Sequence, residues 1–137
     1  MPVPNAKLPA RRAHTDGLPA GVLAALRDGK ALQIRAGSGR HRFIGIWVVV
    51  VDGRAFVRSW SLKPRSWWRT FQGDPRGAIR VAGRSIAVRA VRTRSERLKK
   101  AVDRAYLAKY GTGGSRRYAL DLARPTSRAT TTELVPL

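Results

Sequence analysis

Cysteine is absent from the 137-residue sequence, and histidine is scarce. Without cysteine the chain has no disulfide, no thiolate nucleophile and no cysteine-ligated metal site. Two histidines, His14 and His41, make a poor metal centre on their own, so no metal site is expected. No uncharged stretch is long enough to span a bilayer, so membrane insertion is not expected. The N-terminal region lacks a clear signal-peptide cleavage site, which favours a cytoplasmic protein.

The eight acidic residues leave little material for catalysis by side chains. Asp16, Asp28, Asp52 and Asp74 fall at expected turns or helix ends, where Asp is commonly structural. No two carboxylates form a pair suited to acid–base work. If the protein is an enzyme, a cofactor is therefore expected to carry the reaction.

Basic residues are abundant, and 28 Lys and Arg against eight Asp and Glu give a net charge of +20. Most of them are Arg, whose guanidinium makes forked contacts with phosphate and carboxylate. Two explanations stay open: an anionic partner such as nucleic acid, or the Arg-rich amino-acid usage of a GC-rich genome. Because the basic residues are spread along the chain, net charge alone names no partner.

The spacing of apolar residues, glycine and proline predicts an α+β protein. Residues 1–14 are expected to be a mobile N-terminal arm, and residues 15–137 a single domain. Consecutive hairpins imply antiparallel pairing, so we expect a six-stranded antiparallel split β-barrel with about three helices. The expected helices are 18–28, 64–73 and 95–110. The expected strands are a first strand 30–37, a central strand 43–51, a return strand 54–60, a hairpin over 77–92 and an edge strand within 128–137.

The stretch "VRSWSLKPRSWWRT", residues 57–70, holds three of the four tryptophans among cations and hydroxyls. One interpretation is that the tryptophans close one end of a barrel and the cations are solvated. The other is a binding site for a flat, anionic ligand, since a strand end followed by a helix start offers several convergent donors. The residues alone leave both open.

Residues 46–91 resemble the core of split β-barrel flavin-binding proteins, the pyridoxamine phosphate oxidase-like superfamily. The resemblance lies in a hydrophobic strand, an Asp-Gly hairpin, the "VRS" strand end, the "WWR" helix start and the "RVAGRSIAVRA" hairpin. It is nearest to the deazaflavin-dependent nitroreductases and to an uncharacterised bacterial family related to them. "AYLAKYG" at 105–111 and "RATTTELVP" at 128–136 are similar to the ending of that bacterial family.

The resemblance implies a barrel that holds FMN or a deazaflavin and transfers hydride to or from a small molecule. It implies that Arg58 and Ser59, at the end of the "VRS" strand, hold the cofactor phosphate. The following loop and helix start would close over the cofactor, and the preceding strand would lie against its ring. The residues implied to close over the cofactor are Lys63, Trp67, Trp68 and Arg69. The residues implied to lie against its ring are 42–47, from Arg42 to Trp47.

Two other functions stay open. The first is a nucleic-acid-binding barrel, in which bases stack on aromatic side chains in a cationic groove. The second is a barrel of the same fold that has no cofactor and serves as a binding or scaffold protein. With a flavin site, nucleic acid is expected to bind only non-specifically through charge, and a homodimer is compatible with the fold.

Overall fold

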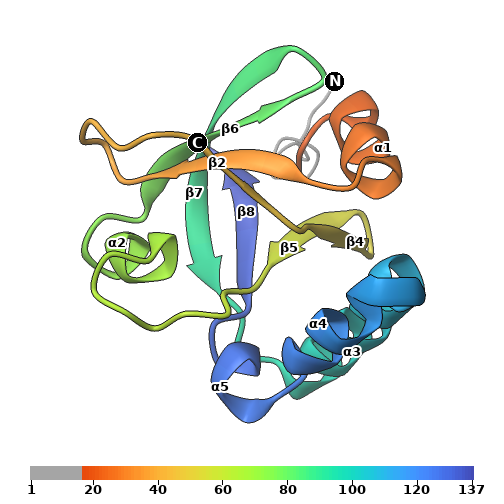
Figure 1. Ribbon diagram of the computed structural model, residues 1–137. Coiled ribbons are helices and arrows are strands. Elements are labelled where there is room, and N and C mark those ends of the chain that lie inside the picture. Colours follow the sequence, from red (N-terminus) through yellow and green to blue (C-terminus); the bar gives the residue numbers. More distant parts are fainter. Residues whose placement is uncertain (1–16) are drawn as a thin grey trace, which may run out of the picture.

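One curled antiparallel sheet organises residues 17–137, the part of the chain that the computed structural model describes (Figure 1). The predicted arm at residues 1–14 and the boundary that follows it lie outside these residues. The sheet order is β3-β2-β6-β7-β8-β5-β4. The strands are β2 (Leu32–Ala36), β3 (Ile44–Ile46), β4 (Val49–Val51), β5 (Arg54–Val57), β6 (Arg76–Val81), β7 (Arg84–Arg92) and β8 (Thr132–Pro136).

Two tight hairpins form where the sequence predicts them. β4 pairs with β5 across Asp52 and Gly53, and β6 pairs with β7 across Ala82 and Gly83. Both residues of each turn have positive φ, near 53° and 70° in the first and 52° and 74° in the second. This is the geometry of a two-residue type I′ turn, whose twist matches that of the flanking strands. The predicted antiparallel pairing of these strands is confirmed. β4 and β5 are shorter than predicted, and β6 begins one residue earlier.

The apolar run at residues 43–51 is not the single central strand that its composition predicts. Its two halves are β3 and β4, which lie at opposite ends of the sheet order. Because Ile46 and Val49 are three residues apart, a chain of at most about 11 Å joins the two ends. The sheet therefore curls into a half-barrel. The predicted count of six strands is wrong because this run bends at Trp47 and Val48 and pairs twice.

The three predicted helices are present as α1 (Ala20–Asp28), α2 (Trp67–Gly73) and α3 (Glu96–Tyr110). α2 begins later than predicted, since Ser66 caps it by accepting the Arg69 N–H and Pro64 lies outside. Ser95 caps α3 as predicted. Three further elements were not predicted: a 3₁₀ turn (Gly113–Ser115), α4 (Arg116–Asp121) and α5 (Pro125–Arg128). None of the helices in residues 17–137 combines the length and apolarity needed to cross a membrane.

The C-terminal strand β8 is central, whereas an edge strand was expected. It pairs with β7 on one side and with β5 on the other. The short helices at residues 116–128 carry the chain from the end of α3 back to the sheet, so that β8 enters between strands that are distant in sequence. A pattern of alternating residues does not distinguish an edge position from a central one.

Two apolar cores lie on the two sides of the sheet. The inner core contains Ile34 and Ile79 from the strands and receives α1 and α2, which contribute Leu26 and Phe71. The second core lies between β4, β5 and α3, with Phe56 against the α3 face. Figure 1 shows α3 and α4 on the side of the molecule where β4 lies, away from α2.

α3 also satisfies the backbone where the apolar run bends. The Tyr106 hydroxyl donates to Trp47 O at 3.3 Å, and Lys109 Nζ donates to Val48 O at 2.8 Å. The Tyr110 hydroxyl accepts the Val48 N–H at 3.2 Å and lies against the carbonyl of Lys30. Burial raises the pKa of Tyr110, which keeps the phenol protonated as a donor. These side chains replace the strand neighbours that Trp47 and Val48 lack.

Replacing Tyr110 by Phe tests this role of α3. We expect Tyr110→Phe to lower the free energy of unfolding by about 1–3 kcal/mol, because it leaves buried backbone groups unpaired. Urea denaturation of the cofactor-free protein measures the change. Tyr118→Phe is the control, since that hydroxyl is exposed and accepts only from Arg117 among the described residues. Equal stability of Tyr110→Phe and wild type would contradict the assignment.

Candidate functional site

Arg58, predicted to hold a phosphate, is directed into the protein, and its side chain is 0% exposed. Nε donates to Thr131 Oγ1 at 2.8 Å, and Nη2 donates to Lys99 O at 2.9 Å. Nη1 donates to Asp103 Oδ1 at 2.5 Å and to Leu122 O at 2.9 Å. Burial lowers the pKa of the Arg58 guanidinium, and the hydrogen bond to Asp103 opposes this shift. The guanidinium thus ties the end of β5 to α3 and to the segment before β8.

Ser59 is also occupied within the protein. Its hydroxyl donates to Ser61 O at 2.7 Å and accepts the Ser61 N–H at 3.1 Å. Its own N–H donates to Thr130 Oγ1 at 2.8 Å. A phosphate role for Arg58 and Ser59 stays a prediction. The hydrogen bonds assign both residues a part in fixing the start of the 60–66 loop.

A substitution separates these two roles of Arg58. We expect Arg58→Ala to lower the free energy of unfolding by about 3–5 kcal/mol without any cofactor, as for one partner removed from a buried ion pair. Chemical denaturation measures this. Arg104→Ala, on an exposed position of α3, is the control and should change stability little. A cofactor-free Arg58→Ala protein as stable as wild type would show that the network is not structural.

The tryptophans of the stretch divide between core and surface. Trp67 and Trp68 are each 9% exposed and belong to the inner core. Trp67 packs edge-on against Phe71 at 6.0 Å between ring centroids, and Trp68 Nε1 is buried without a partner in the described residues. Arg69 lies over the Trp68 ring, 5.1 Å from its centroid, and donates to Leu62 O. The Arg69 guanidinium therefore contacts the loop that precedes α2.

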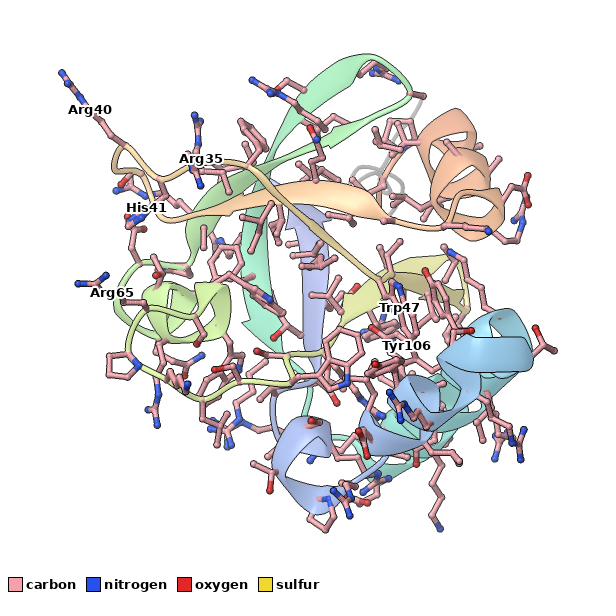
Figure 2. All side chains as sticks on the ribbon, in the orientation of Figure 1. Arg35, Arg40, His41, Trp47, Arg65 and Tyr106 are labelled. Carbon is pink, nitrogen blue, oxygen red and sulfur yellow. The ribbon has the colours of Figure 1, made fainter. Side chains whose placement is uncertain are left out.

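Trp47 lies apart from the other predicted residues. Its ring stacks on that of Tyr110 with centroids 4.0 Å apart, and Trp60 packs edge-on against it at 5.2 Å. Figure 2 shows Trp47 beside Tyr106, on the α3 side of the molecule, with His41 and Arg65 on the opposite side of the view. The predicted site residues therefore do not converge on one place.

A cavity of about 190 Å³ brings together two of the predicted residues, Arg42 and Trp67. It lies where the 37–42 loop, the end of β2 and α2 meet, and Figure 2 shows His41 and Arg65 in the same region. We call it the cationic pocket. Its lining residues are Ile34, Ala36, His41, Arg42, Ile44, Arg65, Trp67 and Thr70. Sequence reasoning missed His41 and Arg65, although Arg65 lies within the tryptophan-rich stretch at residues 57–70.

Asp74 anchors the loop that carries Arg42. Its carboxylate accepts the Ser38 N–H at 2.9 Å and the Ser38 hydroxyl, and it also accepts the Arg76 N–H at 3.2 Å. Gly37, at φ 78°, makes the turn against α2, where an added Cβ would lie 3.0 Å from Thr70 Cγ2. Hydrogen bonds from Ser38, followed by those from Arg76, hold the pKa of Asp74 well below its usual value. The sequence suggested only a turn residue here.

The anchor predicts a specific dependence of stability on pH. Because the folded-state pKa of Asp74 is depressed, its stabilising effect is present above the unfolded pKa near 4 and is lost as pH falls toward the folded value. We therefore expect Asp74→Asn to be less stable than wild type at pH 7, with the gap narrowing below pH 4. Denaturation midpoints at pH 3, 5 and 7 measure it. A gap that is constant across these pH values would contradict the assignment.

The chemistry of the cationic pocket suits an anionic group joined to a flat or apolar one. Arg42 and Arg65 are exposed and form no ion pair within residues 17–137. Ile34 and Trp67 provide an apolar wall beside them. Sites that enclose a whole ligand usually exceed about 300 Å³, so this cavity fits one end of a larger molecule. No group of three His, Cys, Asp or Glu suited to a metal ion occurs in the described range.

Comparison with known proteins places the chain in a family. The family described as "Uncharacterized protein conserved in bacteria (DUF2255)" matches residues 22–134, and the chain belongs to it. A search of curated proteins found no match. The relationship to an uncharacterised bacterial family, expected from the sequence, is thereby confirmed.

Solved structures share the fold at low sequence identity. The conserved hypothetical protein Rv2991 from Mycobacterium tuberculosis matches with a TM-score of 0.58 and 12% identity, over 90% of this chain and 82% of that chain. An F420 reductase matches with a TM-score of 0.50 and 12% identity, over 87% of this chain and 94% of that chain. A FAD-binding protein (mll6688) from Mesorhizobium loti matches with a TM-score of 0.51 and 17% identity, over 88% of this chain and 89% of that chain. At these identities the likeness shows a common fold.

Proposed function

We propose that this member of the DUF2255 family binds a flavin-type cofactor, FMN or a deazaflavin, and acts as an oxidoreductase on a small molecule. The fold supports the proposal, since an F420 reductase and a FAD-binding protein share it. The observation that carries it is the cationic pocket, where Arg42 and Arg65 lie beside an apolar wall. Phosphorylated flavins and deazaflavins combine an anionic end with a flat ring.

In this proposal Arg42 and Arg65 hold the anionic end of the cofactor. Guanidinium groups suit this task, because they donate paired hydrogen bonds to phosphate and stay charged. Trp67 and Ile34 exclude water from one side. The cavity volume of about 190 Å³ would fit the phosphate-bearing end and not the whole cofactor.

The predicted residues between 58 and 69, other than Trp67, take supporting roles, whereas Trp47 lies apart. Lys63 is exposed on the loop that leads to Arg65 and adds positive charge there. Arg58 and Ser59 fix the start of that loop through their internal hydrogen bonds. Trp68 and Arg69 pack as a pair under the same loop. The loop thus has a rigid base and a cationic tip.

The cofactor would supply the hydride-carrying ring, and the chain would bind and orient it. The chain's own acids support this division of labour. Each of the seven acidic residues in the described range forms an ion pair with Lys or Arg. None of them is therefore a free carboxylate held ready for proton transfer.

Titration with FMN and with a deazaflavin, followed by fluorescence, tests the proposal. We expect Arg42→Gln and Arg65→Gln each to weaken binding by roughly 10- to 150-fold, the equivalent of one charge-assisted hydrogen bond. Arg104→Gln, which makes the same charge change on an exposed position of α3, should bind as wild type does.

Two results would contradict the proposal. One is that the wild-type protein binds neither cofactor and shows no flavin-like absorption after gentle purification. The other is that wild-type protein binds a cofactor and the Arg42→Gln/Arg65→Gln double variant, folded, binds it equally well.

A further inference from the structure

Positive charge in residues 17–137 far exceeds what the chain itself neutralises. This range contains 25 Lys and Arg and seven Asp and Glu. The seven acids are all engaged in ion pairs, which involve eight of the basic residues. The sequence before residue 17 holds three more basic residues and one acid, so it is cationic too. Any group that balances the remaining charge must come largely from outside the chain.

Part of this excess gathers on the outer face of β2, β6 and β7, which we call the arginine face. Strand register places Arg80 opposite both Gln33 and Ser85, and Arg76 opposite Arg89. Arg35 is two residues along β2 from Gln33, so it lies on the same side of the sheet, opposite Ala78 on β6. Residues of the alternate parity, such as Ile34, Ile79 and Val88, are buried in the inner core. The face is defined by Gln33, Arg35, Arg76, Arg80, Ser85 and Arg89.

Like charges are held close together on this face. Arg76 and Arg89 are directly opposed across β6 and β7, an arrangement that costs stability. The guanidinium carbons of Arg35 and Arg80 lie 4.9 and 3.9 Å from the centroid of the same ring, Phe43. Among the described residues, Asp74 is the acid that balances this face, through Arg76. Such clustering creates a strong positive potential.

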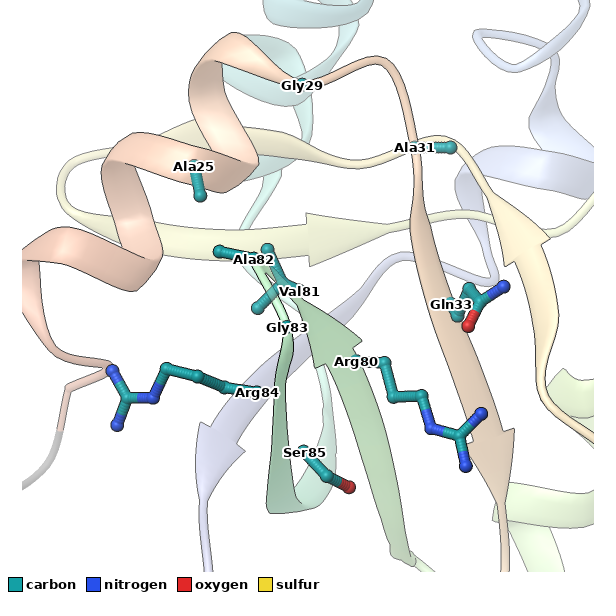
Figure 3. A pocket seen from close by; sticks show the side chains of 10 residues that line it. All are labelled: Ala25, Gly29, Ala31, Gln33, Arg80, Val81, Ala82, Gly83, Arg84 and Ser85. Carbon is teal, nitrogen blue, oxygen red and sulfur yellow. The ribbon is translucent and has the colours of Figure 1, made fainter.

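No described helix covers the arginine face. α1 and α2 pack into the inner core, and α3 packs against β4 and β5. A cavity of about 590 Å³ opens at one end of the face and is lined by Gln33, Arg80 and Ser85 among others. Figure 3 shows Gln33 and Arg80 projecting to the same side, with Arg84 extending the other way. The face is therefore exposed apart from the half-buried Arg35, and Ala25 of α1 borders the hollow at one end.

We propose that the arginine face binds the phosphodiester backbone of nucleic acid, independently of base sequence. Guanidinium side chains suit phosphate, and the outer face of the sheet presents several of them to a polyanion. Phe43 is occupied by the two guanidinium groups, so recognition rests on phosphates rather than on base stacking. The proposal does not depend on cofactor binding.

Other occupants fit the face less well. A second copy of the chain would set the same arginines against one another. A membrane surface is usually bound through large apolar side chains as well as cations, and the Phe43 ring at this face is already occupied by Arg35 and Arg80. Binding of a nucleic-acid backbone matches the arginines that the face presents.

Fluorescence anisotropy with a labelled 20-base-pair DNA duplex over a series of salt concentrations tests the proposal. The slope of log affinity against log salt reports the number of phosphates neutralised. We expect Arg80→Gln/Arg89→Gln to weaken binding and to reduce this slope by about 2, one for each phosphate that is no longer neutralised. Both side chains are exposed and form no ion pair in the described range.

The matched control is Lys100→Gln/Arg104→Gln on α3, which removes the same charge from exposed positions. It should leave affinity and slope near the wild-type values. Equal losses in the two double variants would overturn the proposal and assign binding to net charge alone. Failure of the wild-type protein to bind the duplex, with binding to phosphatidylserine vesicles that needs Arg80 and Arg89, would overturn it in favour of a membrane. Thermal unfolding confirms that each variant is folded.

Discussion

Backbone groups must find partners where a strand leaves its sheet, and this requirement governs the closure of the half-barrel. At Trp47 and Val48 the chain passes from one end of the sheet to the other, and neither residue belongs to a strand. Tyr106, Lys109 and Tyr110 of α3 meet these groups instead. The closed end fixes the position of β3 beside β2. The loop between those strands, which carries Arg42, is thereby held next to α2.

Arg58 provides a second fixed point, also against α3. It joins the end of β5 to α3 through Asp103 and to the segment before β8 through Thr131. A buried guanidinium with four hydrogen bonds is costly to displace, so the chain leaves β5 along a defined path. The loop that follows then delivers Arg65 and Trp67 to the pocket. The two supports thus fix the segments that lead to the two parts of the pocket, as expected of a preorganised anion site.

The hairpins and long helices could be predicted because their signals are local. Asp52–Gly53, Ser95 and the apolar stripe of α3 each specify structure within a few residues. The bend at Trp47 could not be predicted, because a continuous apolar run contains no sign that its halves pair with different strands. Arg58 was expected at a ligand for a related reason. Its partners lie 41 to 73 residues away, and only the folded chain shows that they satisfy it. His41 and Arg65 line one pocket, and Asp74 holds Ser38, through tertiary contacts alone.

The central claim is that a flavin-type cofactor places its anionic end between the 37–42 loop and the start of α2. Hydrogen–deuterium exchange of the whole protein, with and without saturating FMN or deazaflavin, tests it most directly. The account predicts slower exchange in two segments distant in sequence, residues 37–44 and 62–70, with residues 113–118 unchanged. Protection confined to residues 113–118, or no protection in either predicted segment when the cofactor is bound, would contradict it.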